Sequence, residues 1–220
     1  MNVQTLRRSR WGWLTALACV CVFGGLNAGA RAATPELPPP TRTLLAKLEH
    51  AGRAEASVVQ EMADPLGGPP QRRSGRLSLE RPDFARLDFR EPSESVTLRG
   101  DGGEWLQPQL HQMLTFGPAG TGPSTRAWDL LLGRSVHGLT TAAVGPRRWR
   151  MRSTGEVKGL PDSVEVTLDS AGLPVSLTAW LDDTQRVSYQ MSGWHFSAAK
   201  GRAAFVLVAP KGYEIIGTGP

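Results

Sequence analysis

The chain has 220 residues, with 25 Lys and Arg against 20 Asp and Glu and a formal net charge of +5. Four of the arginines lie in residues 1–32, which contain no acid, so the rest of the chain has 21 basic against 20 acidic side chains. That near balance gives no support for nucleic-acid binding. Both cysteines, Cys19 and Cys21, also lie in 1–32, which excludes disulfides and thiolate metal sites from the remainder.

Residues 1–32 have the three parts of a secretory signal peptide. Two adjacent arginines begin a basic stretch, an apolar run follows, and A-R-A at 30–32 matches a cleavage site. Glycines interrupt the apolar run and no stop-transfer charges follow it, which favours cleavage before Ala33 over a membrane anchor. Two alternatives stay open. The arginine pair also fits twin-arginine export, and Cys19 follows a loose lipobox at which a lipid would tether the chain.

After the signal, a Pro-rich leader at 33–40 precedes a single predicted domain at 41–220. The domain begins with a predicted short helix that ends at Gly52. The apolar stripe of this helix consists of Leu44, Leu45 and Leu48.

Most of the domain predicts β-strands, because apolar and polar side chains alternate along it. The stretch GRLSLERPDFARLDFREP at 75–92 has one such run on each side of Arg81-Pro82. One face of these strands must therefore be buried. The apolar positions of the predicted strands in this half are Val58, Leu77, Leu79, Ala85, Leu87, Phe89, Val96, Leu98, Trp105, Met113 and Phe116.

A second short helix is predicted at 124–133, where Trp128 and Leu131 are apolar and Gly133 ends it. The stretch GPRRWRMR at 145–152 predicts a strand with a solvated basic face, although a patch that meets anionic headgroups or an acidic partner is the alternative. The apolar positions of the later predicted strands are Val164, Val166, Leu168, Leu173, Val175, Leu177, Ala179, Leu181, Val187, Tyr189, Met191, Phe205 and Leu207.

These patterns predict a mainly β domain with two short helices. About ten strands at hairpin spacing, each with one apolar face, are typical of antiparallel sheets with one wet side. The apolar faces must be covered, either in a two-sheet sandwich or in one strongly curved sheet that closes on itself with helices as a plug. In the second arrangement a mouth remains for an apolar ligand. Periodicity alone leaves both open.

Motifs for catalysis are missing from the sequence. The four histidines have no ligand-spaced partners, and neither a G-x-S-x-G nor a Walker motif occurs. Ser197 and Lys200 match S-x-x-K, but the companion motifs of that enzyme class are absent. We therefore expect a binding protein rather than an enzyme, without metal or cofactor.

The order of motifs resembles the outer-membrane lipoprotein carrier family, LolA, over roughly 41–217. A short helix, VVQEM, the R-P corner at 81–82, DGGEWLQP and an apolar helix follow one another as in that family. The ending matches F-x-x-x-x-P-x-G at Phe205, Pro210 and Gly212.

The resemblance implies an incomplete, strongly curved antiparallel β-barrel with short helices as a lid over an apolar cavity. It implies a monomeric periplasmic chaperone without chemistry, which takes acylated lipoproteins from an inner-membrane ABC transporter to an outer-membrane acceptor. A membrane-tethered, LolB-like receptor or lipid-sensing regulator on the same fold is the alternative.

For individual residues, the resemblance matches Arg81 to the arginine that latches the lid and is needed for cargo release. Ala85 and Leu87 stand where the family usually has aromatic residues, so another acyl lipid could replace the lipoprotein as cargo. The predicted cavity lining is Leu44, Leu45, Leu48, Leu77, Leu79, Leu87, Phe89, Val96, Leu98, Trp105, Met113, Trp128 and Leu131.

Overall fold

The computed structural model describes residues 39–64, 67–117, 128–134, 138–157, 159–181 and 185–218. The predicted signal at 1–32, most of the leader at 33–40 and the first part of the predicted helix at 124–133 lie outside these residues.

The predicted first helix is confirmed as α1 (Pro39–Ala51). It ends at Gly52, whose backbone has a φ of 97° and donates its N–H to the Leu48 carbonyl at 2.8 Å. A left-handed residue at this position is easiest for glycine, which has no Cβ to clash. The stripe of Leu44, Leu45 and Leu48 is buried, so α1 uses its apolar face to pack on the sheet.

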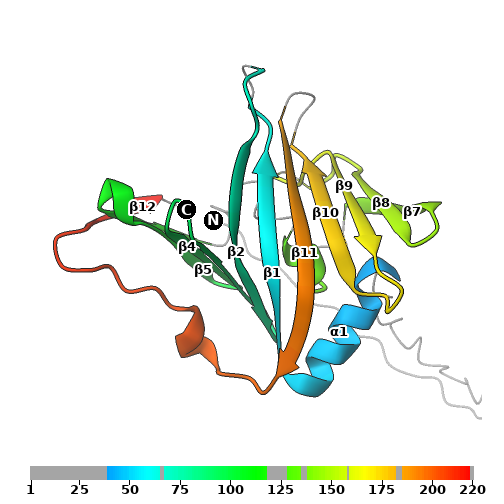
Figure 1. Ribbon diagram of the computed structural model, residues 1–220, viewed down its shortest axis with the longest axis horizontal. Helices are drawn as coiled ribbons and strands as arrows, with labels where there is room; N and C mark the ends of the chain where they lie inside the picture. The colour runs from blue at the N-terminus through cyan, green and yellow to red at the C-terminus, as the bar shows by residue number, and fades with distance from the viewer. Residues whose placement is uncertain are drawn as a thin grey trace, which may run out of the picture. The chain divides into compact units, whose positions relative to one another are not determined.

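One antiparallel sheet forms most of the fold (Figure 1). Its strands are β1 (Arg53–Met62), β2 (Gln71–Glu80), β3 (Phe84–Phe89), β4 (Glu94–Arg99), β5 (Gly102–Gln107), β6 (Gln112–Phe116), β7 (Leu139–Gly145), β8 (Arg148–Ser153), β9 (Ser163–Leu168), β10 (Pro174–Trp180), β11 (Arg186–Ser197) and β12 (Glu214–Thr218). Their order is β12-β6-β5-β4-β3-β2-β1-β11-β10-β9-β8-β7. Only the pairing of β12 with β6 is parallel among these strands.

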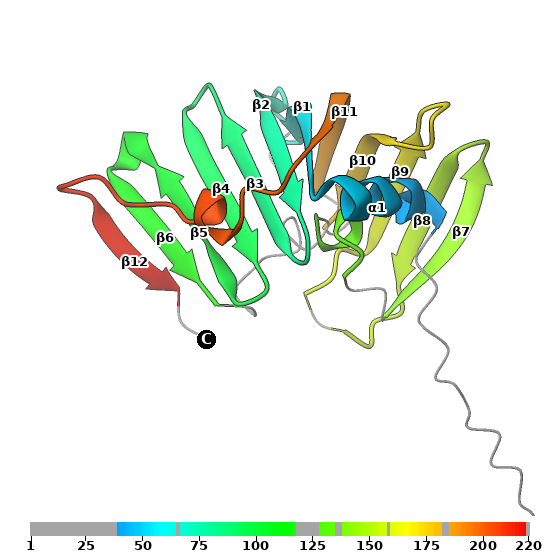
Figure 2. The same cartoon turned by 90° about the horizontal axis from the view of Figure 1, so that it is seen from below.

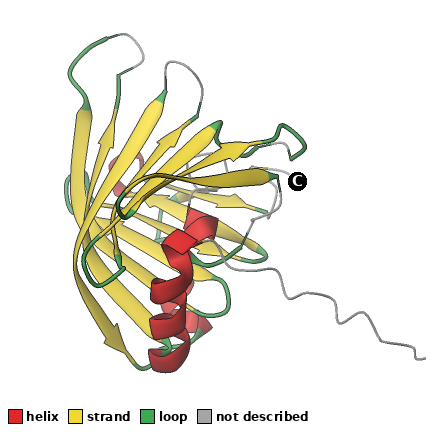
Figure 3. Ribbon diagram, turned by 90° about the vertical axis from the view of Figure 1, so that its right-hand side faces the viewer, coloured by secondary structure: helices red, strands yellow, loops and turns green. Residues whose placement is uncertain are grey.

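The sheet is open, with β12 at one edge and β7 at the other. Figure 3 shows it curving around the side on which α1 lies. All twelve strands belong to one sheet, so the curved-sheet prediction is confirmed and the two-sheet sandwich is not formed by the described residues.

The two faces of this sheet differ in chemistry. We call inner the face that packs against α1 and against residues 128–134, and outer the opposite face. Register places Val58, Gly75 and Phe89 side by side on the inner face, and Glu55, Ser78 and Arg86 on the outer. Because side chains alternate along each strand, register assigns residues to a face wherever no β-bulge interrupts the pairing, as one does between β1 and β11.

A carboxy-terminal arm, residues 198–213, leads from β11 to β12 and contains the 3-10 helix η2 (Arg202–Phe205). Figure 2 shows the arm passing over β3 and β4. The prediction of a strand at Phe205 and Leu207 is wrong, because the arm has no strand neighbour there. Instead, Arg86 and Arg99 donate hydrogen bonds to the carbonyls of Ala204 and Phe205, at 3.0 and 2.9 Å.

Two short elements complete the described fold. The 3-10 helix η1 (Pro108–Leu110) joins β5 to β6. Residues 128–131 form a helical turn within the segment 128–134, which agrees with the second predicted helix as far as it is described. None of the described helices has the length and apolar character needed to cross a lipid bilayer.

Candidate functional site: an apolar cavity under Trp128

A cavity of about 150 Å³ lies between the inner face of the sheet and Trp128. Its walls come from the neighbouring strands β11, β1, β2, β3, β4, β5 and β6. The lining residues are Gln60, Met62, Arg73, Leu87, Phe89, Glu94, Val96, Leu98, Trp105, Phe116, Trp128 and Tyr189.

Alternation in three neighbouring strands builds the main wall. Leu87 of β3 lies opposite Val96 of β4, which in turn lies opposite Trp105 of β5. Along β4, the lining residues Glu94, Val96 and Leu98 occupy every second position. Since a strand rises about 3.3 Å per residue, the cavity wall extends about 13 Å along β4. The cavity is therefore a slot that runs along the strands.

Gly103 leaves room for one end of the slot. It lies opposite Phe116 on the inner face, and a Cβ atom at this position would come within 2.6 Å of the Phe116 ring. Glycine therefore allows the ring to lie flat against β5 and to line the cavity. An aromatic ring can therefore form the cavity wall here because the residue opposite it has no side chain.

Trp128, at the start of the segment 128–134, forms one wall of the cavity. Trp128 is only 1% exposed, and its ring meets the Tyr189 ring edge-on, with centroids 4.4 Å apart. Three leucines of the segment, at 130–132, are also buried. At its end, Arg134 forms ion pairs with Asp129 at 3.0 Å and with Asp83, beside the R-P corner, at 3.9 Å. The segment thus contacts the sheet mostly through apolar side chains, with a hydrogen bond from Trp128 to Tyr189 and one charge pair in addition.

Polar side chains gather at one end of the slot. Gln60 lies between Arg73 and Tyr189 in the register of β2, β1 and β11, and donates a hydrogen bond to the Tyr189 hydroxyl at 3.1 Å. Arg73 forms an ion pair with Glu94 at 2.7 Å, and the Trp105 indole donates to the same carboxylate oxygen at 3.1 Å. Burial raises the pKa of Tyr189, so its hydroxyl stays protonated at neutral pH.

Of the thirteen residues predicted to line an acyl-chain cavity, six lie around this pocket. These six are Leu87, Phe89, Val96, Leu98, Trp105 and Trp128. Six others are buried in packing contacts away from the lining: Leu44, Leu45, Leu48, Leu77, Leu79 and Leu131. Met113 is buried on the outer face, opposite Leu106. Arg81 is exposed in the turn between β2 and β3.

The sequence interpretation missed the polar part of the lining and its apolar neighbours Met62 and Phe116. A signal for it exists. Gln60 is in phase with Ala54, Ala56 and Val58, so it is a polar residue on an otherwise apolar strand face. The four missed residues with polar groups are Gln60, Arg73, Glu94 and Tyr189.

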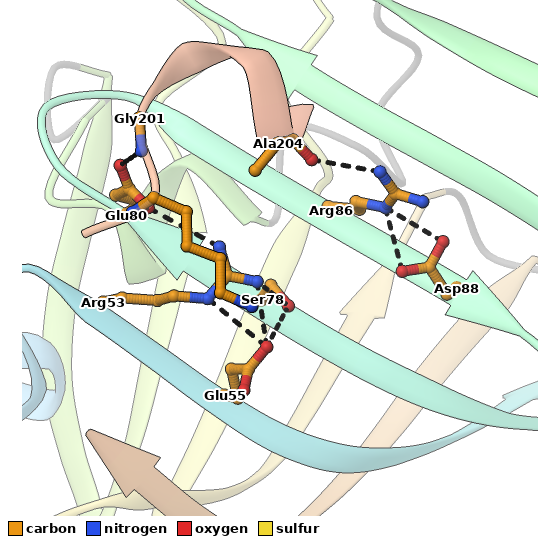
Figure 4. A network of polar contacts seen from close by, with 9 residues as sticks. Arg53, Glu55, Ser78, Glu80, Arg86, Asp88, Gly201 and Ala204 are labelled. Atoms are coloured by element: carbon orange, nitrogen blue, oxygen red, sulfur yellow. Dashed lines mark hydrogen bonds and ion pairs between the residues drawn. The ribbon is translucent and has the colours of Figure 1, made fainter. Parts of the chain in front are cut away.

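Buried charges hold the carboxy-terminal arm on the outer face (Figure 4). Glu80, which is 2% exposed, accepts hydrogen bonds from the backbone N–H groups of Lys200 and Gly201 at 2.9 and 2.7 Å. Arg53 approaches Glu80 at 3.5 Å and forms an ion pair with Glu55 at 2.9 Å. The hydrogen bond from Arg53 lowers the pKa of Glu55.

Further along the outer face, Glu104 repeats this arrangement. It forms an ion pair with Arg99 at 2.5 Å and accepts hydrogen bonds from the Thr97 hydroxyl at 2.6 Å and the Leu207 backbone N–H at 3.3 Å. Burial alone would raise the pKa of Glu104, but the hydrogen bonds from Arg99 and Thr97 outweigh it and lower the pKa. The aromatic ring of Phe205 in the arm stacks on Phe84 between these two carboxylates, with centroids 5.3 Å apart.

Fold and cavity together define a class of protein: an open, curved antiparallel sheet that encloses an apolar slot under a short helical cover. No group of three or more metal-ligating side chains occurs among the described residues.

Several solved structures are similar to this chain. No family model and no curated protein matches the sequence. The chain is similar to an uncharacterized conserved protein from Thermus thermophilus, at 12% identity over 80% of this chain and 98% of that one, with a TM-score of 0.47. It is also similar to a LolA superfamily protein from Nitrosomonas europaea, at 10% identity over 76% and 97%, with a TM-score of 0.43. A third similar structure is the Mycobacterium tuberculosis lipoprotein LppX, at 12% identity over 70% and 92%, with a TM-score of 0.33.

Proposed function

We propose that the chain is a periplasmic chaperone that holds the acyl chains of a lipoprotein, or of a related acyl lipid, in the inner-face slot. In this role it carries them between the inner and outer membranes without chemistry. The observation that carries the proposal is the apolar slot closed by Trp128, whose walls are mostly hydrocarbon and aromatic. An inner-membrane ABC transporter as donor and an outer-membrane acceptor complete the proposal.

The energetics of an acyl chain explain why such a slot would be needed. Each CH₂ group removed from water contributes about 0.8 kcal/mol, so a lipid anchor in water requires an enclosed apolar site. The cavity of about 150 Å³ is of the size that accepts a benzene ring. A complete acyl chain needs more volume than this. Binding would therefore require the segment 128–134 to move away and let the chain take the place of Trp128.

Movement of the segment 128–134 would cost little in specific contacts. The inner face of the sheet exchanges one apolar neighbour for another when a lipid replaces the side chains of the segment. The ion pair of Arg134 with Asp83 has both side chains more than a quarter exposed, so it contributes at most about 1 kcal/mol. Arg81, two residues before Asp83, is proposed as the latch that acts during cargo release.

Native mass spectrometry of the protein isolated from its own periplasm tests this function. We expect one acyl lipid or acylated protein to co-purify with each chain, and its mass to be that of an intact lipid. Protein that carries no acyl species and binds none in titrations would contradict the proposal. A diacylglyceryl group on Cys19 would instead identify the tethered receptor. Substitution of Ser197 or Lys200 by Ala should leave transfer intact, as expected without catalysis.

A further inference from the structure

The polar end of the slot lies next to the hairpin loops of the sheet. Gln60 and Arg73 are each two residues from the ends of β1 and β2 that meet in the loop at 63–70, and Glu94 is the first residue of β4. Leu98, at the far end of the wall, lies about 13 Å away along β4. The slot therefore has a polar end beside the loops and an apolar end deep in the sheet.

Arg73 and Glu94 use only part of their hydrogen-bonding capacity. Within the described residues, Arg73 donates to Glu94 through Nη1 alone, and its guanidinium lies 5.9 Å from the centroid of the Phe89 ring. Glu94 accepts both of its hydrogen bonds, from Arg73 and from the Trp105 indole, on Oε2. A guanidinium has five donors and a carboxylate has two oxygens. Donors on Arg73 and one oxygen on Glu94 thus remain for a ligand in the same cavity.

The charges of this pair determine which ligand group fits beside it. The two side chains are 17% and 10% exposed, so charges near them are poorly screened by water. A free fatty acid would bring a second carboxylate next to Glu94, and an amine would bring a cation next to Arg73. Like charges in such a site repel strongly. A neutral group with one acceptor and one donor would satisfy Arg73 and Glu94 together.

We propose that the slot selects acyl chains that end in a neutral group with both a hydrogen-bond acceptor and a donor, such as an amide or a hydroxylated ester, over free fatty acids. The carbonyl of the group binds Arg73 and its N–H or O–H binds Glu94. The hydrocarbon chain then runs from the loop end of the slot toward Leu98. This inference rests on the proposed function, since it requires that the slot holds an acyl chain.

Isothermal titration with dodecanamide and dodecanoate at neutral pH tests the selection. For the unmodified protein we expect dodecanamide to bind about tenfold more tightly, the effect of one charged hydrogen bond against an uncompensated repulsion. Glu94→Gln leaves Arg73 without its counter-charge and should reverse the preference in favour of dodecanoate. The double substitution Arg73→Gln and Glu94→Gln should bind both ligands within about twofold of each other, because the charges that discriminate are gone.

Controls separate this selection from folding and from the proposed function. Arg76→Gln changes an exposed arginine on the outer face of the same strand as Arg73 and should keep the preference of the unmodified protein. Circular dichroism and thermal unfolding check that each variant is folded. Equal affinities, or tighter binding of dodecanoate by the unmodified protein, would overturn the selection while leaving an acyl carrier. If neither ligand binds the unmodified protein, the proposed function fails as well.

Discussion

The inner face of the sheet meets its cover through apolar side chains, whereas the outer face meets the carboxy-terminal arm through buried charges. On the inner side, Trp128 and the leucines at 130–132 are buried and make mostly apolar packing contacts. On the outer side, Glu80 and Glu104 accept hydrogen bonds from specific backbone N–H groups of the arm. Apolar burial is non-directional, but charged hydrogen bonds require one geometry.

This difference indicates which cover can be exchanged. An acyl chain can replace the apolar surface of Trp128, and only the hydrogen bond from its indole to Tyr189 would be lost among the directional contacts of that ring. Nothing apolar can replace the arm, since its departure would leave Glu80, which is 2% exposed, without the two backbone N–H groups that bond to it. We therefore expect the inner cover to open and the outer arm to remain in place.

The largest expected effect comes from neighbouring residues on opposite faces, Leu79 and Glu80. Glu80→Ala removes the acceptor for two backbone N–H groups of the arm and should cost about 3–5 kcal/mol of unfolding free energy. Leu79→Ala leaves a cavity on the inner face and should cost about 2–5 kcal/mol. The two variants should loosen different parts of the chain. Trypsin should cut Glu80→Ala after Lys200 or Arg202 under native conditions, but should not cut Leu79→Ala there.

Urea unfolding and timed proteolysis measure both parts of this prediction. If trypsin cuts the arm equally fast in both variants, the outer charges do not hold the arm specifically, and the contrast between the faces is lost.

The next largest effect is expected on ligand binding. We compare two substitutions to phenylalanine, one inside the slot and one on the outer face. Val96→Phe adds a ring inside the slot, so we expect dodecanamide affinity to fall about tenfold or more, with about 1–3 kcal/mol lost in stability. Leu106 lies on neighbouring β5 but on the outer face, and Leu106→Phe should leave affinity unchanged. Isothermal titration checks both variants. Equal loss of affinity in both would place the binding site outside the slot.

The sequence predicted the apolar wall because its signal is local. Leu87, Phe89 and Val96 alternate with charged or polar neighbours, and alternation alone assigns such residues to a buried face. The same reasoning gives no signal for Arg73 and Glu94, since charged residues on strands usually face water. Their position in the slot depends on the register of β2 with β3 and β4, which connects residues 21 apart in the chain.

The arm was mispredicted for a related reason. Phe205 and Leu207 are apolar and two residues apart, which is typical of a strand. Their backbone groups, however, bond to Arg99 and Glu104, more than a hundred residues earlier. Such long-range side-chain partners leave no pattern in the local sequence, so tertiary contacts overrode the local preference.

A smaller loss of stability should appear when the pH is lowered, and we expect it first on the outer face. The pKa values of Glu55 and Glu104 are lowered in the folded chain from an ordinary value of 4.5. Their contribution to stability is fully present above pH 4.5 and is lost as the pH falls through the lowered values. Tyr189 of the slot has a raised pKa and keeps its proton throughout this range. We therefore expect the arm to loosen at acid pH before the inner face does.

Hydrogen exchange of the arm amides between pH 7 and pH 3, corrected for the intrinsic rate, measures this loosening. Glu104→Gln should show weaker protection at neutral pH and a smaller change with pH, because one of the titrating groups is missing. An inner face that loses protection at the same pH as the arm would contradict the prediction.

The smallest effect on stability is expected at Arg81, where only transfer should change. Its side chain is exposed, so Arg81→Leu should alter unfolding free energy by no more than about 0.5 kcal/mol and leave dodecanamide affinity unchanged. If Arg81 latches the segment 128–134 during release, transfer of a fluorescent acyl ligand to acceptor vesicles should slow. Arg76→Leu removes an exposed arginine from the outer face of β2, and this variant should transfer the ligand at the normal rate. Asp83→Asn weakens the ion pair that ties Arg134 to the corner and should speed release, because the inner cover then opens more easily. Normal transfer by Arg81→Leu would leave Asp83 and Arg134 as the polar contact that controls this opening.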